Sequence, residues 1–426
     1  MRAKIVHLVS QDLGGAGKAC VRLHLALLKA GLNSSVLLST KATNAPGLLN
    51  LKQSKLQKSI NKTLRNLSLL PLRKSLKTAK DYFSPNIRIY AQNEAALLAN
   101  LESIDPDLVH LHWIEGGFVN VATLENLQVP LLWSLHDENP YTGGCHYVPN
   151  DCNGYKDGCL ACPLLFDSKK QKPPSYKNAA RLTFSNKQAS YEGLDLTING
   201  LSSWIAARAR ESSLLGKHPV INLPNPIDTS LYKPISRGLA KEILGVAGPR
   251  ITIGFGAVGG SATRRKGFLE LKEALSNLKR HSYHLLVYGG SSEAIEGLEM
   301  TNLGELKDEL SLVLFYNACD IFIQPSLAEN LSNAIMESLS CGTPVVSFDI
   351  GGNADMIDPG YNGYLAKPMD TKDLARGIEW LASLSLSHAS QIREQARQSV
   401  LDKFSYEVVA PLYAAAYKNI LEKSKT

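Results

Sequence analysis

Four of the seven cysteines of this chain lie within one short stretch, YTGGCHYVPNDCNGYKDGCLACPLL, at positions 141–165. Their spacing is C-x6-C-x6-C-x2-C. A C-x2-C pair with two further thiols can close a tetrahedral zinc site, here from Cys145, Cys152, Cys159 and Cys162. Nearby glycines allow the sharp turns that wrapping a small ion requires. Two alternatives stay open: thiols without a metal, including redox-active ones, and an iron–sulfur cluster.

The other three cysteines, Cys20, Cys319 and Cys341, are expected to behave as small buried apolar residues. The sequence shows neither a signal-peptide pattern nor an apolar run approaching about 18 residues. We therefore expect a cytoplasmic protein, in which thiols stay reduced, and this expectation disfavours disulfides in the cysteine-rich stretch.

Charged residues in the second half form another candidate site. Glu329 and Glu337 stand eight residues apart on a helix predicted near 329–341, and a carboxylate accepts two hydroxyl donors well. Their spacing alone also fits the solvated face of an ordinary helix. Upstream, Lys266 lies in SATRRKGF, where a fixed cation can stabilise a leaving anion. The arginines before it also fit plain surface charges.

His136 and Asp137 directly follow a strand-like run, PLLWSL. They should therefore lie at the carboxyl edge of a parallel sheet, where ligands of open α/β folds bind. A histidine there can act as a general base if its pKa is tuned and it reaches the acceptor hydroxyl. It can equally be a packing residue.

A glycine-rich turn, QDLGGAGKA at 11–19, joins the first predicted strand to a helix. Its backbone N–H groups, around Gly15 and Gly17, can approach an anion. Cys20 stands where a dinucleotide fingerprint needs its third glycine or alanine, and Ala19 stands where a P-loop needs serine or threonine. A nicotinamide oxidoreductase is therefore disfavoured, and a tight strand–helix turn is the plain alternative.

Strand-like runs alternate with helical patterns almost throughout, which predicts parallel sheets covered by helices. The first series of runs covers 3–10, 34–40, 107–113, 130–137 and 196–200. After PNPID at 224–228 the pattern restarts, with runs at 250–257, 284–290, 320–326 and 343–349 and a helix near 267–280. A final amphipathic helix is predicted over 405–423. Two such α/β halves facing each other would make a ligand-binding cleft.

The motif set resembles retaining glycosyltransferases of family 4. The resemblance rests on the Glu-x7-Glu pattern with its Pro-Ser and CGTPVV flanks, and on motifs in the same order: GGAG (14–17), HD (136–137), PNPID (224–228), KG (266–267), Gly304 and GG (351–352). DLVHLHW and LLWSLHDENPYTGGCHY look like bacterial exopolysaccharide enzymes of the colanic-acid type, which carry a similar cysteine-rich insert. The resemblance covers nearly the whole chain apart from about 41–95.

This resemblance implies an α/β GT-B fold: two Rossmann-like domains facing a cleft, with a C-terminal helix crossing back to the N-terminal domain. The expected acceptor-side domain covers 1–226 and includes a basic amphipathic insert at about 52–80 and the cysteine-rich loop 141–165. The nucleotide-sugar-binding domain is expected over 227–404, and the terminal helix over 405–426. The cysteine-rich loop would then shape the acceptor entrance.

The resemblance also implies residue roles. Glu337 would hold the ribose of a nucleotide-diphosphate sugar and Glu329 the hydroxyls of the donor sugar. Catalytic roles are expected for His136, Asp137, Lys266 and Glu329. Donor binding is expected from Gly15, Gly17, Arg265, Lys266, Glu329, Asn330, Leu331, Ser332 and Glu337.

The expected chemistry proceeds with retention and without a catalytic cofactor. The family's usual arginine is missing from GFGAVGG, and Arg265 is favoured over Arg264 as its substitute. No Asp-x-Asp motif stands where a nucleotide-bound metal would lie, so metal-independent transfer is predicted, with the leaving phosphate helping to deprotonate the acceptor. The only metal expected is a possible structural zinc at the four cysteines.

The segment 52–80 holds nine Lys/Arg and no acidic residue, and the rest of the chain is close to neutral. This distribution argues against a nucleic-acid-coating protein. Apolar residues mark one face of a predicted helix and basic residues the other: Leu56, Ile60, Leu64 and Leu67 against Lys58, Lys62 and Arg65. Such a helix can dock on an anionic membrane. The alternative is that its leucine face packs on the domain.

We therefore predict a transferase that moves a sugar to a polyprenyl-lipid-linked glycan in bacterial surface polysaccharide biosynthesis. It would be cytoplasmic and peripheral at the inner face of the plasma membrane, with no nucleic-acid partner. The alternative is a catalytically silent GT-B-fold partner in a membrane-associated glycan-assembly complex. The base, the sugar, the acceptor and the linkage are not identified by the sequence.

Overall fold

The computed structural model describes residues 3–70, 83–86, 94–149, 152–160, 162–165, 177–256, 263–278, 282–290 and 293–424. Contacts divide the chain into two units. Unit 1 is Met1–Asn225 with Ala410–Thr426, and unit 2 is Pro226–Val409.

Unit 1 is built on a seven-stranded sheet in the order β3-β2-β1-β4-β5-β6-β7, with every neighbouring pair parallel. The strands are β1 (Lys4–Gln11), β2 (Asn33–Thr40), β3 (Leu48–Asn50), β4 (Leu108–Leu111), β5 (Leu131–Leu135), β6 (Leu196–Gly200) and β7 (Val220–Asn222). Its α-helices are α1 (Gly14–Lys29), α2 (Lys55–Leu69), α4 (Glu94–Ile104), α5 (Gly154–Asp157), α6 (Lys177–Tyr191), α7 (Ser203–Glu211) and most of α14 (Tyr406–Lys423).

Strand alternation sends β1 side chains to two differently covered faces of this sheet. Val6 and Leu8 pack into one apolar core with Phe184 of α6. Val9 packs on the opposite face with Cys20 of α1. Both faces are therefore covered by helices, as a parallel sheet requires.

The terminal helix α14 is anchored to unit 1 by two buried tyrosines. The Tyr417 hydroxyl lies 2.8 Å from His110 Nδ1, and the Asn199 amide donates to the Tyr413 hydroxyl at 2.9 Å. Residues near the end of the chain are thus tied to strands β4 and β6.

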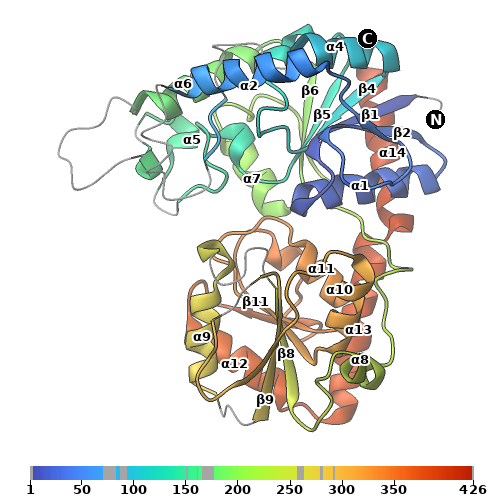
Figure 1. The fold of residues 1–426 in the computed structure, drawn as a ribbon, viewed down its shortest axis with the longest axis vertical. Coiled ribbons are helices and arrows are strands. Elements are labelled where there is room, and N and C mark those ends of the chain that lie inside the picture. Colours follow the sequence, from blue (N-terminus) through green and yellow to red (C-terminus); the bar gives the residue numbers. More distant parts are fainter. Residues whose placement is uncertain are drawn as a thin grey trace. The chain divides into compact units, whose positions relative to one another are not determined.

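Unit 2 is built on a six-stranded sheet in the order β10-β9-β8-β11-β12-β13, again entirely parallel. The strands are β8 (Ile251–Gly256), β9 (Tyr283–Tyr288), β10 (Glu299–Asn302), β11 (Ile321–Gln324), β12 (Val345–Phe348) and β13 (Gly363–Ala366). The helices are α8 (Arg237–Ile243), α9 (Phe268–Ser276), α10 (Glu309–Ala318), α11 (Asn333–Ser340), α12 (Thr371–Ala382) and α13 (Leu386–Phe404). In Figure 1, α9 and α12 lie on one side of this sheet and α8 and α10 on the other.

The predicted alternation of strands and helices is confirmed in both units, and each of the nine predicted strand-like runs contains a strand. Four short strands, β3, β7, β10 and β13, were not predicted. The helix predicted near 329–341 begins only at Asn333, so Glu329 lies in the loop before it. Predictions on residues 71–80 and 257–260 fall outside the described residues.

Candidate functional site

The residues predicted to do chemistry fall into two groups, one in each unit. In unit 2 the group surrounds the loop between β11 and α11 and the 3-10 turn Arg264–Lys266. In unit 1 it follows the carboxyl ends of β1, β4 and β5. The joint use of both groups on one substrate stays a prediction.

Glu329 forms the centre of the unit 2 group. Its Oε2 accepts from Lys266 Nζ at 2.7 Å and from Arg265 Nη1 at 3.3 Å, and Arg265 Nη1 also donates to the Ala328 carbonyl at 2.8 Å. Burial alone would raise the pKa of this carboxyl, but Lys266 and Arg265 outweigh it and lower the pKa to about 2. Glu329 is therefore a fixed carboxylate held by two cations.

The two neighbouring arginines point to different partners. Arg264 forms a bidentate pair with Glu270 on α9, at 2.7 and 2.6 Å, while Arg265 reaches the Glu329 loop. Of these two arginines, only Arg265 contacts Glu329 beside Lys266, and its role as the substitute for the family's arginine stays a prediction.

Glycines bring the turn and the loop close together. Gly267 has φ 75°, and a Cβ built there would overlap the Pro325 carbonyl oxygen. Gly351 has φ 54°, and a Cβ there would overlap the Glu329 carbonyl oxygen. Both are positions where only glycine permits the conformation and the approach, which accounts for the KG and GG motifs.

Glu337 is buried on α11, with 4% of its surface exposed, and this excludes the solvated-helix-face alternative. Its Oε2 accepts from the Tyr316 hydroxyl at 2.9 Å, and Tyr288 Oη lies 3.2 Å from Tyr316 Oη. Burial, and next the Glu337 charge, raise the pKa of the Tyr316 hydroxyl, so it stays protonated and donates. Neither tyrosine could be predicted from a local motif, because Tyr288 lies on β9 and Tyr316 on α10.

The loop Asn330–Ser332 leads into α11, and all three residues are buried. The Gly352 N–H donates to the Asn330 carbonyl at 2.9 Å, which ties this loop to the glycine pair after β12. Ser332 is the N-cap residue of α11, and its side chain makes no capping hydrogen bond.

In unit 1, His136 begins a hydrogen-bonded chain of histidines. His136 Nε2 lies 2.9 Å from His112 Nδ1, and His112 Nε2 lies 3.0 Å from His7 Nδ1. Burial lowers the pKa of all three rings, that of His136 to about 4, so they are neutral at physiological pH. The predicted His136 is thus brought together with His112 and His7, which were not predicted; the H-x-H of DLVHLHW was a signal for His112 only.

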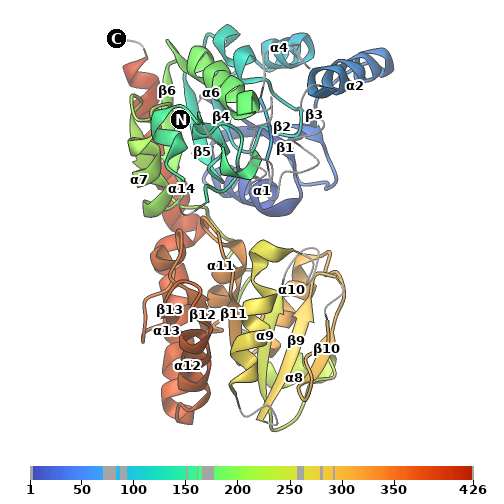
Figure 2. The same ribbon diagram turned by 90° about the vertical axis from the view of Figure 1, so that its left-hand side faces the viewer.

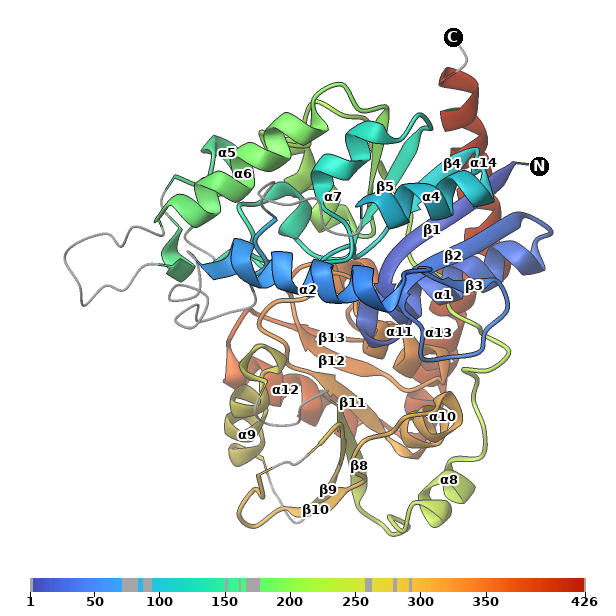
Figure 3. The same ribbon diagram turned by 45° about the horizontal axis from the view of Figure 1, so that its top comes forward.

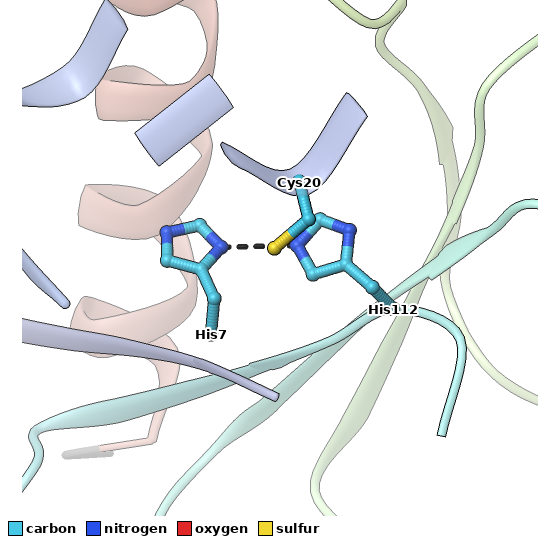
Figure 4. A group of neighbouring side chains, drawn as sticks. All are labelled: His7, Cys20 and His112. Carbon is cyan, nitrogen blue, oxygen red and sulfur yellow. Dashed lines mark hydrogen bonds between the residues drawn. The ribbon is translucent and has the colours of Figure 1, made fainter. Parts of the chain in front are cut away.

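Figure 4 shows Cys20 beside this chain. One ligand atom each from His7, Cys20 and His112 lies within 4.8 Å of the others. The two imidazoles, however, share a proton with each other, and all three residues are 2% exposed or less. We therefore assign the cluster to the histidine chain, and Cys20 is buried as predicted.

Asp137 is fully engaged in holding the cysteine-rich loop. It accepts from Trp113 Nε1 at 3.0 Å and from the Asn139 N–H at 2.9 Å, and its Oδ2 lies 2.6 Å from His146 Nδ1. Burial would raise its pKa, but the neighbouring His146 and these hydrogen bonds lower it overall. This geometry suits a positioning residue better than the catalytic role predicted from the sequence.

The next two residues continue the attachment of the loop. Glu138 accepts from Tyr141 Oη at 2.7 Å, from Arg208 Nε at 2.6 Å and from the Val148 N–H at 2.6 Å. The Asn139 side chain accepts from Lys187 of α6 at 2.8 Å, and Lys187 is completely buried. Lys187 and Asn139 are 48 residues apart in the sequence, so no local motif could predict that this buried lysine contacts Asn139.

The glycine turn after β1 is tight but packs mainly against its own strand. A Cβ built on Gly17 would overlap the Gln11 carbonyl, so this glycine permits close helix–strand packing. Asp12 accepts from the N–H and hydroxyl of Thr43 at 2.6 and 2.7 Å and so holds the loop after β2. Gly15 lies in the first turn of α1.

The basic helix α2 begins at a capping box formed by Ser54 and Gln57. Leu56, Ile60 and Leu67 are 70, 47 and 46% exposed. The alternative that this leucine face packs on the domain is therefore wrong for these residues. Figure 2 shows α2 at the edge of unit 1, beyond β3. None of the described helices combines the length and apolar composition that crossing a bilayer requires.

Comparison with known proteins places these features in a family context. Residues 252–383 match the family model described as "Glycosyl transferases group 1". The chain is 29% identical over 164 residues to N,N'-diacetylbacillosaminyl-diphospho-undecaprenol alpha-1,3-N-acetylgalactosaminyltransferase of Campylobacter jejuni, covering 37% of this chain and 42% of that protein. It is 29% identical over 167 residues to the lipopolysaccharide core biosynthesis glycosyltransferase LpsE of Rhizobium meliloti, covering 36% and 46%. The matched segments thus span less than half of these relatives.

Solved structures resemble the chain over nearly its whole length. Sucrose-phosphate synthase from Thermosynechococcus elongatus superposes with a TM-score of 0.69 at 17% identity, covering 99% of this chain and 100% of that one. Anabaena HepE in complex with UDP-glucose gives 0.67 at 16% identity, covering 98% and 100%. The two parallel-sheet Rossmann-like units form a GT-B fold, as predicted. The family-model match covers less than a third of the chain, and the solved structures resemble it in fold.

Proposed function

We propose that this protein is a retaining glycosyltransferase that moves a sugar from a nucleotide-diphosphate sugar to a polyprenyl-lipid-linked glycan in bacterial surface polysaccharide biosynthesis. The observation that carries the proposal is the cluster of Lys266, Arg265 and Glu329, with Glu337 buried on the following helix. The turn Arg264–Lys266 offers two cations, and the loop before α11 and that helix offer two carboxylates, which is the set of groups that a donor with diphosphate, ribose and sugar requires.

Donor binding is assigned as follows. Glu337, whose carboxylate is oriented by the Tyr316 hydroxyl, accepts hydrogen bonds from the ribose. Glu329, ionised and held by Lys266, accepts from hydroxyls of the donor sugar. Backbone amides of Asn330, Leu331 and Ser332 face donor oxygens, and Gly15 and Gly17 let the α1 turn approach the donor. The UDP-glucose bound to Anabaena HepE supports a nucleotide sugar as the donor class.

The chemistry follows from where charge develops. As the glycosidic bond to the diphosphate breaks, negative charge grows on the leaving oxygens, and Lys266 and Arg265 stabilise it more in the transition state than in the ground state. The leaving phosphate accepts the acceptor's proton on the same face of the sugar, so the configuration is retained and no catalytic metal takes part. Neutral His136 orients the sugar, and Asp137 positions the adjoining loop through His146.

The acceptor and its location rest on two observations. The Campylobacter relative carries a diphospho-undecaprenol acceptor in its name. In addition, α2 exposes apolar residues while no acidic residue lies in 52–80. A cation-rich helix with an exposed apolar stripe suits an anionic bilayer surface, where a polyprenyl-linked acceptor resides.

The test is a transfer assay with a panel of nucleotide sugars and polyprenyl-linked acceptors, run on the wild type and Glu337→Gln. Turnover by the wild type that falls at least about tenfold in Glu337→Gln is expected, because the substitution removes a charge-assisted hydrogen bond. Glu422→Gln, an exposed substitution on α14, is the matched control. Absence of turnover across the whole panel would instead favour the catalytically silent partner.

A further inference from the structure

The cysteine-rich loop of unit 1 encloses a small cavity. Its volume is about 10 Å³, and all four cysteines of the stretch line it, together with Phe83 and others. This volume is close to that of one water-sized sphere. Four sulfur-bearing side chains thus surround a space for one small ion, and none of the seven cysteines forms a disulfide.

Each cysteine reaches the cavity from a separate short turn. Cys145 forms an isolated bridge with Phe83, and Cys152 closes a turn through its N–H to the Pro149 carbonyl at 2.8 Å. Cys159 follows Gly158, the C-cap of the single turn α5, and Cys162 precedes the 3-10 turn Pro163–Leu165. Figure 3 shows α5 next to one end of α6, whose Ala180 also lines the cavity.

The backbone is strained at Cys159, one of the four residues whose thiols line the cavity. Cys159 has φ 52°, directly after Gly158 with φ 102°. A left-handed conformation is unfavourable for a residue with a Cβ. The Gly143 N–H donates to Cys159 Sγ at 3.2 Å, and a Cβ built on Gly154 would lie 3.5 Å from both Cys152 Sγ and Cys159 Sγ. An amide donor to sulfur favours the thiolate, which is the form that binds a metal.

We propose that Cys145, Cys152, Cys159 and Cys162 bind one structural zinc ion as four thiolates. Four S–H bonds break, four Zn–S bonds form, and four protons leave for solvent, with no change of oxidation state. Zn–S bonds of about 2.3 Å place the sulfurs of a tetrahedral site about 3.8 Å apart. No three of the four sulfurs lie within 4.8 Å of one another here, so zinc binding draws them inward around the cavity.

Zinc fits this space better than an iron–sulfur cluster. An all-sulfur tetrahedral set selects zinc or iron–sulfur centres among the common biological metals. A cluster adds bridging sulfides and at least a second iron to the enclosed volume, whereas a cavity of about 10 Å³ accommodates a single ion.

The zinc ion closes the loop that begins at the end of β5. Asp137, Glu138 and Asn139 tether one side of this loop, and the four thiolates hold the other. Zinc therefore acts here as a structural clip beside His136, with no part in group transfer. The inference stands independently of the proposed function.

The test is elemental analysis of the full chain, purified without a metal-affinity resin. About one zinc per chain is expected for the wild type, falling below about a fifth of an equivalent in Cys152→Ser and in Cys162→Ser, because each loses one of four ligands. Cys20→Ser is the matched control and should retain the full equivalent, since it changes the His7 and His112 cluster instead.

Three results would overturn the proposal. One is less than about half an equivalent of any metal together with four readily titrated thiols in the loop. Another is iron with acid-labile sulfide in place of zinc. The third is zinc that is lost from Cys20→Ser but retained in Cys152→Ser.

Cobalt substitution gives a second readout, which uses the wild type and so does not depend on the folding of a variant. The cobalt-substituted wild type should show the intense visible absorption and the sulfur-to-metal charge transfer of tetrahedral cobalt thiolate. An octahedral spectrum would contradict the site.

Discussion

At the scale of single residues, two adjacent arginines provide a controlled comparison. Arg265 contacts Glu329 and the Ala328 carbonyl, whereas Arg264 is occupied by Glu270. We expect Arg265→Gln to lower kcat/KM for transfer by about ten- to a hundredfold, because one of two cations near the leaving diphosphate is lost. Arg264→Gln should change it less than about twofold. Equal losses in both variants, measured by steady-state kinetics, would refute the assignment of Arg265.

Because Glu329 is ionised in the folded protein, the stability of the fold should depend on pH in the acid range. Its pKa in the folded protein is about 2, below the ordinary value of 4.5. A lowered pKa means that the ionised group stabilises the fold above about pH 4.5 and that this contribution is lost as the pH falls towards 2. The urea midpoint of the wild type should therefore exceed that of Glu329→Gln at neutral pH, and the gap should narrow below about pH 4.5. A gap that stays constant down to pH 3 would contradict this.

We predict that His112 affects the rate of the chemical step and not the binding of the donor. It joins His136 to His7, so its two hydrogen bonds fix which nitrogen of His136 carries the proton. We expect His112→Phe to lower kcat about tenfold or more while leaving the donor KM within about twofold, since the cations and carboxylates proposed to hold the donor lie in unit 2. His388→Gln, an exposed substitution, is the control. A parallel rise in donor KM would place His112 in donor binding instead.

The residues that could be predicted were those marked by local motifs. Glu329, Glu337 and Lys266 stand in short, ordered patterns, and the structure brings Lys266 into contact with Glu329. The partners of these residues could not be predicted in the same way. Tyr316, His7 and Lys187 reach their sites from other elements, and one sequence does not reveal contacts between distant segments.

At the scale of elements, α2 has the clearest unexplained surface. Leu56, Ile60 and Leu67 are exposed on it, and so are the basic residues Lys58 and Lys62. We expect co-sedimentation with anionic vesicles to fall at least about tenfold when Lys58, Lys62 and Arg65 become Gln, because each basic residue near the surface contributes about 1 kcal/mol. Removing three exposed charges elsewhere, Lys233, Lys367 and Lys372, should have little effect. Unchanged binding of the α2 variant would rule out this docking role.

Element boundaries show where sequence periodicity is insufficient. The apolar runs of β1, β5 and β11 were found because buried parallel strands are nearly continuous apolar segments. The strands β3, β7, β10 and β13 were not predicted because they are the edge strands of the two sheets and are only partly buried, so no continuous apolar run marks them. The helix α11 begins as late as Asn333 because of tertiary contacts. Gly351 packs against the Glu329 carbonyl, and the Gly352 N–H donates to the Asn330 carbonyl, so the preceding loop is held by residues that local helical propensity does not take into account.

At the scale of the whole molecule, the two α/β units followed from the restart of the strand pattern after PNPID. The return of the last helix to unit 1 rested on the resemblance alone, and the structure supplies its physical cause. Tyr413 and Tyr417 bury hydroxyls that find partners on β6 and β4, so α14 is held by hydrogen bonds as well as by apolar packing.

The division into units predicts that donor binding and metal binding are separable. A nucleotide sugar at about 100 times its Kd should stabilise the folded protein by about 2.7 kcal/mol, or roughly 5–10 °C in the melting temperature of a unit of this size. Glu337→Gln in unit 2 should weaken donor binding about tenfold, so the same donor concentration should stabilise it by only about 1.4 kcal/mol, and it should retain the full zinc equivalent. Cys152→Ser in unit 1 should lose the zinc, and its melting temperature without donor should fall. The donor should still raise that temperature by about as much as in the wild type. Loss of the donor shift in Cys152→Ser, measured by scanning fluorimetry beside elemental analysis, would show that the cysteine loop takes part in donor binding and that the two sites are coupled.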